Sequence, residues 1–115
     1  MDRYQHQAHL LKYMAHPMRL QILDRLREAD ECVCHLAAVL AKPQPYVSQQ
    51  LAVLRKAGLI RDRKDGTRTY YGLAERRDGR ELSAVLDTVL PALSDAAPGH
   101  QRIAGCCCPQ CAVAE

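Results

Sequence analysis

The pattern of apolar residues in this chain changes its period sharply at Gly58. Before that glycine, apolar side chains recur at the spacing of one helix face, at Val47, Leu51 and Leu54. After it, the stretch LIRDRKDGTRTYYGL, residues 59–73, is rich in β-branched and aromatic residues and centres on Asp65-Gly66. Asp-Gly between two such runs is a strong signal for a tight β-hairpin. The sequence therefore predicts a helix that ends at Gly58 and is followed directly by a hairpin.

Three more helices are expected before this helix. Residues 4–15 and 17–28 carry apolar side chains at helical spacing. His16-Pro17 separates them, because proline disfavours helix in the residue before it. A short third helix is predicted over residues 32–41, with Asp30 as its N-cap.

The predicted third and fourth helices are joined by a tight turn, KPQP, at residues 42–45. A last helix is expected over residues 79–96, with Pro91 as a kink. The chain has five tyrosines and no Phe or Trp, so its core must be aliphatic, which suits packed helices. Helix, short turn, helix and basic hairpin is the order of a winged helix-turn-helix. We predict a mainly α fold with a β-hairpin wing over residues 1–97, and a flexible Cys-rich tail over residues 98–115.

Basic side chains are concentrated where this fold would meet DNA. Residues 55–80 carry nine basic and four acidic side chains, whereas residues 81–115 carry one basic and four acidic. In a helix-turn-helix the second helix presents its outer face to the major groove, and a basic stripe marks the path of phosphates. The alternative is a solvated helix face and a charged loop. The candidate contacts on double-stranded DNA are Gln44, Tyr46, Ser48, Gln49, Gln50, Arg55, Lys56, Arg61, Arg63, Lys64 and Arg68.

Four stretches of the chain resemble the ArsR/SmtB family of bacterial metal-sensing repressors: LKYMAHPMRLQILDRL, ECVCHLA, PQPYVSQQLAVLRKAGLI and RKDGTRTYYGL. The resemblance covers about residues 8–75. It implies a homodimer paired through the first and last helices, and repression of an operator that is released when an inducer binds. One departure is Pro43, where the family usually has a Ser or Thr cap that proline cannot supply.

Clustered cysteines are the second unusual feature of the chain. No apolar run is long enough to span a membrane and no signal peptide is seen, so we expect a cytoplasmic protein with reduced thiols. In that setting clustered Cys indicates metal or redox chemistry. The six cysteines are Cys32, Cys34, Cys106, Cys107, Cys108 and Cys111.

The resemblance makes ECVCH the thiolate box of the family, at the start of the third helix. On a regular helix Cys32 and Cys34 point about 200° apart, so both reach one ion only if the helix start is distorted. Arsenic-sensing relatives commonly carry a third Cys where this chain has Ala37. We therefore expect a composite site that adds one or two tail cysteines to this pair. His35 is a further candidate ligand, although we expect a solvated residue there; the plain alternative for the pair itself is two small buried apolar residues.

Soft thiolate ligands select soft ions. Three sulfurs suit As(III), Sb(III) or Pb(II), and four suit Cd(II) or Zn(II). The family's second site, on the last helix, is expected to be absent: Asp87 and His100 fit parts of it, but Val89 and Ile103 stand where ligands should be.

Three other readings of the thiols remain open. Oxidation to a disulfide or polysulfide could be the signal for the same repressor. Cys108-Pro109 resembles a haem-responsive dipeptide, and the tail could bind Zn(II) only to order itself. Catalysis is not expected, because the C-x-x-C at Cys108–Cys111 lacks the strand–helix setting of thiol–disulfide oxidoreductases.

Overall fold

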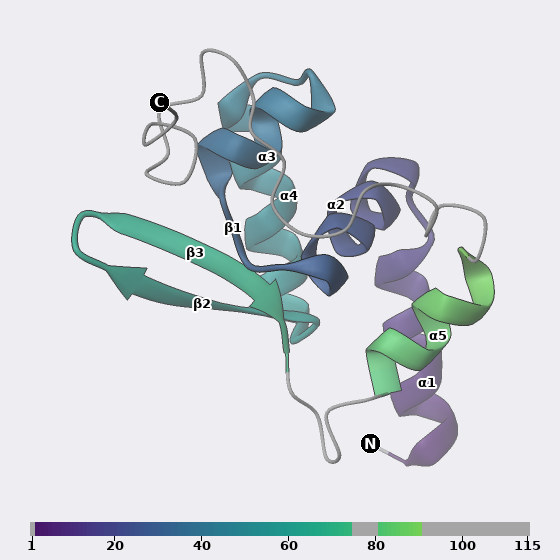
Figure 1. Cartoon of the computed structure of the whole chain (residues 1–115). Helices are drawn as coiled ribbons and strands as arrows, with labels where there is room; N and C mark the ends of the chain where they lie inside the picture. The colour runs from purple at the N-terminus through teal and green to yellow at the C-terminus, as the bar shows by residue number, and fades with distance from the viewer. Residues whose placement is uncertain (1, 75–80, 91–115) are drawn as a thin grey trace.

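The computed structural model describes residues 2–74 and 81–90. The described helices and strands are α1 (Arg3–Met14), α2 (Pro17–Glu28), β1 (Glu31–Cys32), α3 (Val33–Leu40), α4 (Gln44–Ala57), β2 (Ile60–Asp65), β3 (Arg68–Leu73) and α5 (Glu81–Val89). Figure 1 shows the β2–β3 hairpin extending away from the packed helices, with α5 on the same side of the molecule as α1. The predicted mainly α fold with a hairpin wing is confirmed. No described helix is long and apolar enough to cross a membrane.

Local sequence signals account for most helix ends. Asp2 and Gln5 form a reciprocal capping box at the start of α1. His16 accepts the Met18 N–H through its ring at the start of α2, where Pro17 occupies the first turn. At the start of α4, Pro43 is the N-cap without a side-chain cap, as its lack of a polar side chain predicts. Gly58 ends α4 with φ 87°, a left-handed conformation that glycine adopts without strain.

The wing is part of a three-stranded antiparallel sheet in the order β1-β3-β2. The β2–β3 turn leaves Asp65 opposite Arg68, with Gly66 at φ 68°, which agrees with the hairpin predicted at Asp65-Gly66. On the other edge of β3, Cys32 pairs with Tyr70. This β1 pairing was not predicted from the sequence.

The strand β1 corrects the expected start of the third helix. That helix begins at Val33, and Cys32 rather than Asp30 is its N-cap residue. Residues 31 and 32 are extended because their backbone groups pair with β3. Asp30 instead forms ion pairs with two arginines of β2.

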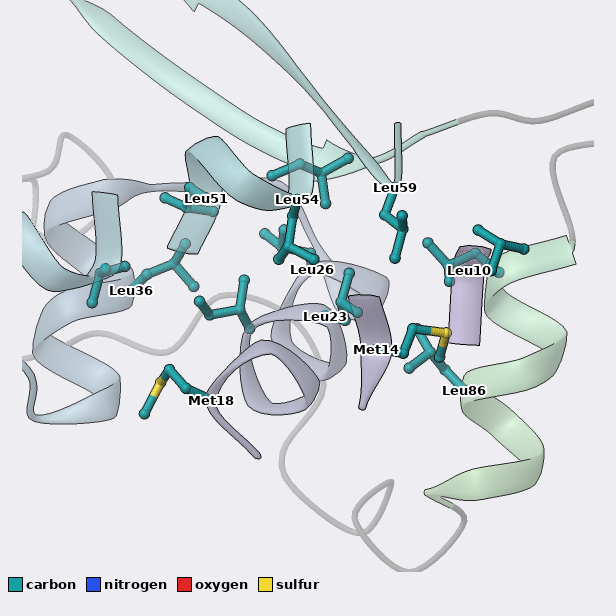
Figure 2. Packing of buried hydrophobic residues seen from close by; sticks show 14 of the residues in the cluster. Leu10, Met14, Met18, Leu23, Leu26, Leu36, Leu51, Leu54, Leu59 and Leu86 are labelled. Carbon is teal, nitrogen blue, oxygen red and sulfur yellow. The ribbon is translucent and has the colours of Figure 1, made fainter. Parts of the chain in front are cut away.

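Leucines from every helix form the core beneath the sheet. Val47, Leu51 and Leu54, the predicted inner face of α4, are all fully buried. Figure 2 shows Leu86 of α5 beside Met14 and Leu10 of α1. The last helix was predicted over residues 79–96. Its described part ends at Val89, and Pro91 lies outside the described residues, as do the proposed domain boundary and the tail.

Candidate functional site

The two cysteines of ECVCH lie side by side. Cys32 is extended, with φ −85° and ψ 161°, and Cys34 is in the first turn of α3. Their Sγ atoms are 3.2 Å apart. The separation expected on a regular helix does not apply, because only Cys34 belongs to the helix. Neither Cys32, which is buried, nor Cys34, which is half-buried, is part of a disulfide. A strand-to-helix junction therefore places two sulfurs where one soft ion can reach both.

The thiol pair opens into a hollow between the helices and the wing. We call it the thiol hollow, and its volume is about 470 Å³. The residues that line it include Cys32, Cys34, Gln44, Thr67, Arg68 and Thr69. Arg68 reaches from β3 and donates an Nη1–H to Cys34 Sγ at 3.1 Å. A guanidinium next to a thiol favours the thiolate, which is the form that binds metals. The hollow thus brings the candidate metal ligands together with Gln44 and Arg68, two candidate DNA contacts.

A buried acid–base pair lies beside the thiols. Glu31 Oε2 is 3.5 Å from His35 Nε2, and both side chains are fully buried. Burial raises the pKa of Glu31 from 4.5 to about 7; the positive charge of Arg25 opposes this shift and the charge of Asp30 adds to it. The expectation that His35 is a solvated helix residue is wrong. It lies on the inner face of α3, next to Leu36 in the sequence and four residues after Glu31 of β1.

Replacing Glu31 by glutamine is expected to stabilise the fold above pH 7. A buried carboxyl whose folded pKa is about 7 keeps its proton where the unfolded chain has lost it. Stability is therefore lost as the pH rises from about 4.5 to about 7. Glu31→Gln removes this loss and should raise the free energy of unfolding by about 1–3 kcal/mol at pH 8, with little gain at pH 4. Urea unfolding at both pH values measures this. Glu28→Gln, exposed at the end of α2, is the control, and an equal gain at both pH values would contradict the interpretation.

The outer face of α4 is only partly exposed. Gln44, Ser48 and Gln49 are exposed, as the DNA interpretation requires. Tyr46 is half-buried and packs against the core. Gln50 accepts a hydrogen bond from Arg19 Nε at 3.0 Å. The structure therefore leaves Gln44, Ser48 and Gln49 as the more open candidates for base contacts.

Acidic neighbours orient most of the predicted wing and flank arginines. Asp30 contacts Arg61 at 3.1 Å and Arg63 at 3.4 Å. Arg55 pairs with Asp62 at 2.7 Å. Exposed ion pairs add little stability, about 0–1 kcal/mol each, so their main effect is to position the guanidinium groups. Lys56 and Lys64 are exposed.

Sequence reasoning missed the side chains that hold these elements. Arg19 of α2 binds Gln50, and His9 of α1 places its Nε2 3.0 Å from the carbonyl oxygen of Ala57 at the end of α4. Asp30 was expected to cap a helix and anchors the wing instead. Gly72 is the sequence feature that could have indicated the contact between Asp30 and the wing, because it pairs with Arg61 across the sheet. A side chain there would collide with the Asp30 carboxylate and the Arg61 guanidinium.

Known proteins share the sequence pattern and the fold of this chain. Residues 16–62 match the bacterial regulatory protein, arsR family. An uncharacterized HTH-type transcriptional regulator of Methanocaldococcus jannaschii is 40% identical over 78 residues, which make up 67% of this chain and 88% of that protein. The crystal structure of the transcriptional repressor BigR from Xylella fastidiosa superposes with a TM-score of 0.71 and 34% identity. That match covers 83% of this chain and 93% of BigR. The chain belongs to the arsR family.

Membership in the arsR family makes this chain a DNA-binding transcriptional repressor of winged helix-turn-helix fold. Its relatives are regulators rather than enzymes, in agreement with the prediction that catalysis is absent. Some members of this fold are homodimers: the solution structure of a homodimeric winged helix-turn-helix DNA-binding domain from Mycobacterium bovis has a TM-score of 0.66 and 26% identity. It matches 89% of this chain and 94% of that domain.

Proposed function

We propose that this repressor releases its operator when a soft metal or metalloid binds Cys32 and Cys34. The distance of 3.2 Å between the two sulfurs carries the proposal. With metal–sulfur bonds of about 2.3 Å, that separation gives a sulfur–metal–sulfur angle of about 90°, whereas a tetrahedral ion needs sulfurs about 3.8 Å apart. An angle near 90° suits pyramidal As(III) or Sb(III) better than Zn(II). Pb(II) and Cd(II), which also prefer sulfur, come next.

The remaining ligands are proposed to come from the tail. Within residues 2–74 and 81–90 no group of three or more His, Cys, Asp or Glu side chains could hold a metal ion. The thiol pair therefore needs donors from elsewhere, and Cys106, Cys107, Cys108 and Cys111 supply soft ones. These four cysteines lie outside the described residues.

The position of the thiol pair makes an effect on DNA binding feasible. Cys34 lies in the first turn of α3, and the thiol hollow is also lined by Gln44 at the start of α4. Thiolate sites release about 10 kcal/mol or more when they bind metal. Allosteric coupling needs only about 1–3 kcal/mol of that energy. A small rearrangement at the junction of β1 and α3 is therefore sufficient to weaken operator binding.

An operator-release titration tests this function. The purified repressor, bound to a labelled operator fragment, is titrated under strict reduction with As(III), Sb(III), Cd(II), Pb(II) and Zn(II) in turn. We expect release at the lowest concentration by As(III) or Sb(III). No release by any of the five would contradict the proposal.

Thiol oxidation is the second candidate function, and the same sulfur distance favours it. A disulfide bond is about 2.05 Å long, so the sulfurs of Cys32 and Cys34 would need to move together by only about 1 Å. The pair would lose two electrons and two protons to an oxidant or polysulfide. This alternative would be selected if an oxidant or polysulfide released the operator and none of the five ions did.

The operator is proposed to be double-stranded DNA bound by a homodimer. We infer that α4 enters the major groove, that the wing arginines and lysines follow the phosphates, and that α1 and α5 pair the two subunits. The exposed apolar side chains of the described residues support this pairing, since Tyr4 and Leu11 lie on α1 and Val89 lies on α5. The exposed Gln44, Ser48 and Gln49 support the groove assignment.

A further inference from the structure

The wall of the thiol hollow carries groups that bind anions. Arg68 supplies a guanidinium, Thr67 and Thr69 supply hydroxyls, and Gln44 supplies an amide. Among the described residues that line it, none carries a carboxylate. Its volume of about 470 Å³ is much larger than a single ion needs, since a water molecule takes up about 30 Å³. The hollow therefore has room for an anionic group beside the two thiols.

Its place in the fold identifies the anion. The hollow lies between the first residue of α4 and the turn of the wing, which are the two elements expected to lie on the operator. About half to two-thirds of protein–DNA hydrogen bonds go to the phosphates and sugars, and Arg, Thr and Gln side chains are common donors to phosphate oxygens. Resting on the function proposed above, we propose that the thiol hollow receives one phosphate of the operator backbone, and that the inducer competes with this phosphate because an ion on Cys34 displaces the Arg68 guanidinium that holds it.

Arg68 connects the two ligands directly. Its Nη1–H already contacts Cys34 Sγ at 3.1 Å. A guanidinium carries five N–H donors, so contacts to the sulfur and to phosphate oxygens are compatible. A soft ion on Cys34 neutralises the negative charge that holds the guanidinium and occupies the space beside it. Inducer binding thereby withdraws one phosphate anchor from each subunit.

Salt dependence and backbone neutralisation test the phosphate site. Arg68→Gln is expected to weaken operator binding about tenfold or more, and to lower the slope of log K against log salt by about 0.9 per subunit, or about 1.8 for a dimer. A methylphosphonate scan of the operator should reveal one position per half-site whose neutralisation weakens the wild type but leaves Arg68→Gln unaffected. Arg68→Lys keeps the charge and should keep the slope, which separates loss of the contact from loss of the fold.

Adding As(III) to the same salt titration tests the competition between inducer and phosphate. As(III) is added at concentrations at which part of the operator stays bound. The slope of log K against log salt for the wild type should then fall to the value for Arg68→Gln, and the slope for Arg68→Gln should not fall further. Lys64→Gln is the matched control, because Lys64 is an exposed residue of the wing that does not line the hollow. Its slope should still fall when As(III) is added.

The outcomes separate the two proposals. The phosphate site is overturned by two results together. The salt dependence of operator binding by Arg68→Gln would equal that of the wild type, and each methylphosphonate would weaken the variant as much as it weakens the wild type. Release by As(III) with no change of slope overturns the competition alone. If As(III) does not release the wild type at all, the proposed function and the competition both fail, and the methylphosphonate comparison still decides the phosphate site.

Discussion

Replacing either Cys32 or Cys34 by serine is expected to raise the As(III) concentration for half-release of the operator by about 100-fold or more. Thiolate sites with four ligands release about 10–16 kcal/mol, or about 3 kcal/mol for each sulfur. Each 1.4 kcal/mol corresponds to about a factor of ten in affinity. Serine keeps the size and polarity of the side chain, but its hydroxyl is a poor ligand for soft ions. Operator affinity without inducer should stay close to the wild-type value in Cys32→Ser, because the sulfur of Cys32 is proposed to touch neither DNA nor Arg68; Cys34→Ser also removes the sulfur that accepts the Arg68 hydrogen bond, so its operator affinity is measured separately.

Two further variants make this test specific. Ala38→Ser introduces the same hydroxyl at an exposed position of α3 and should leave the response unchanged. Replacing Cys106, Cys107, Cys108 and Cys111 together by serine should weaken the response while the Cys32–Cys34 pair still binds the ion. The measurement is a titration of the operator complex by fluorescence anisotropy. Wild-type release by both single-cysteine variants would show that the inducer binds elsewhere.

Periodicity and turn chemistry in the sequence predicted most of the fold. The inner face of α4 and the Asp65-Gly66 hairpin both depend on neighbours in sequence, so local patterns were sufficient for them. The strand β1 was missed because two residues have no period, and they are extended only because Tyr70 and Tyr71 of β3 pair with them. Long-range strand pairing of this kind leaves no local signal.

The same missing strand explains the misjudged geometry of the thiol pair. The sequence predicted Cys32 and Cys34 as candidate ligands but placed both on one helix, where they would diverge. With Cys32 in β1, the helix dihedral angles begin only at Val33 and the two sulfurs converge. Tertiary packing likewise decides the partners of Asp30, His35 and Arg19. A polar residue near a helix start can cap the helix, pair with a distant residue or face solvent, and the local sequence does not distinguish these cases.

Replacing Leu11 by glutamate is expected to dissociate the proposed dimer and, with it, operator binding. Leu11 is 54% exposed on α1, and Tyr4, two turns earlier on the same helix, is 74% exposed. Val89 of α5 is 53% exposed, while Leu86 one turn earlier is fully buried against α1 and so fixes α5 beside it. Exposed apolar side chains on two adjacent helices are what a symmetric interface buries.

The expected effect is large because a two-fold interface contains each residue twice. Losing a buried leucine removes about 1.5–3 kcal/mol, and burying two unpaired carboxylates adds several more. The dimer dissociation constant should therefore rise by about 100-fold or more. Sedimentation velocity measures it, with Leu11→Met expected to remain dimeric and Gln21→Glu, an exposed position of α2, as the charge control. A dimeric Leu11→Glu would place the interface elsewhere. If the variant is monomeric, its affinity for a full operator should fall to that for a half-site, because a monomer contacts only one half-site.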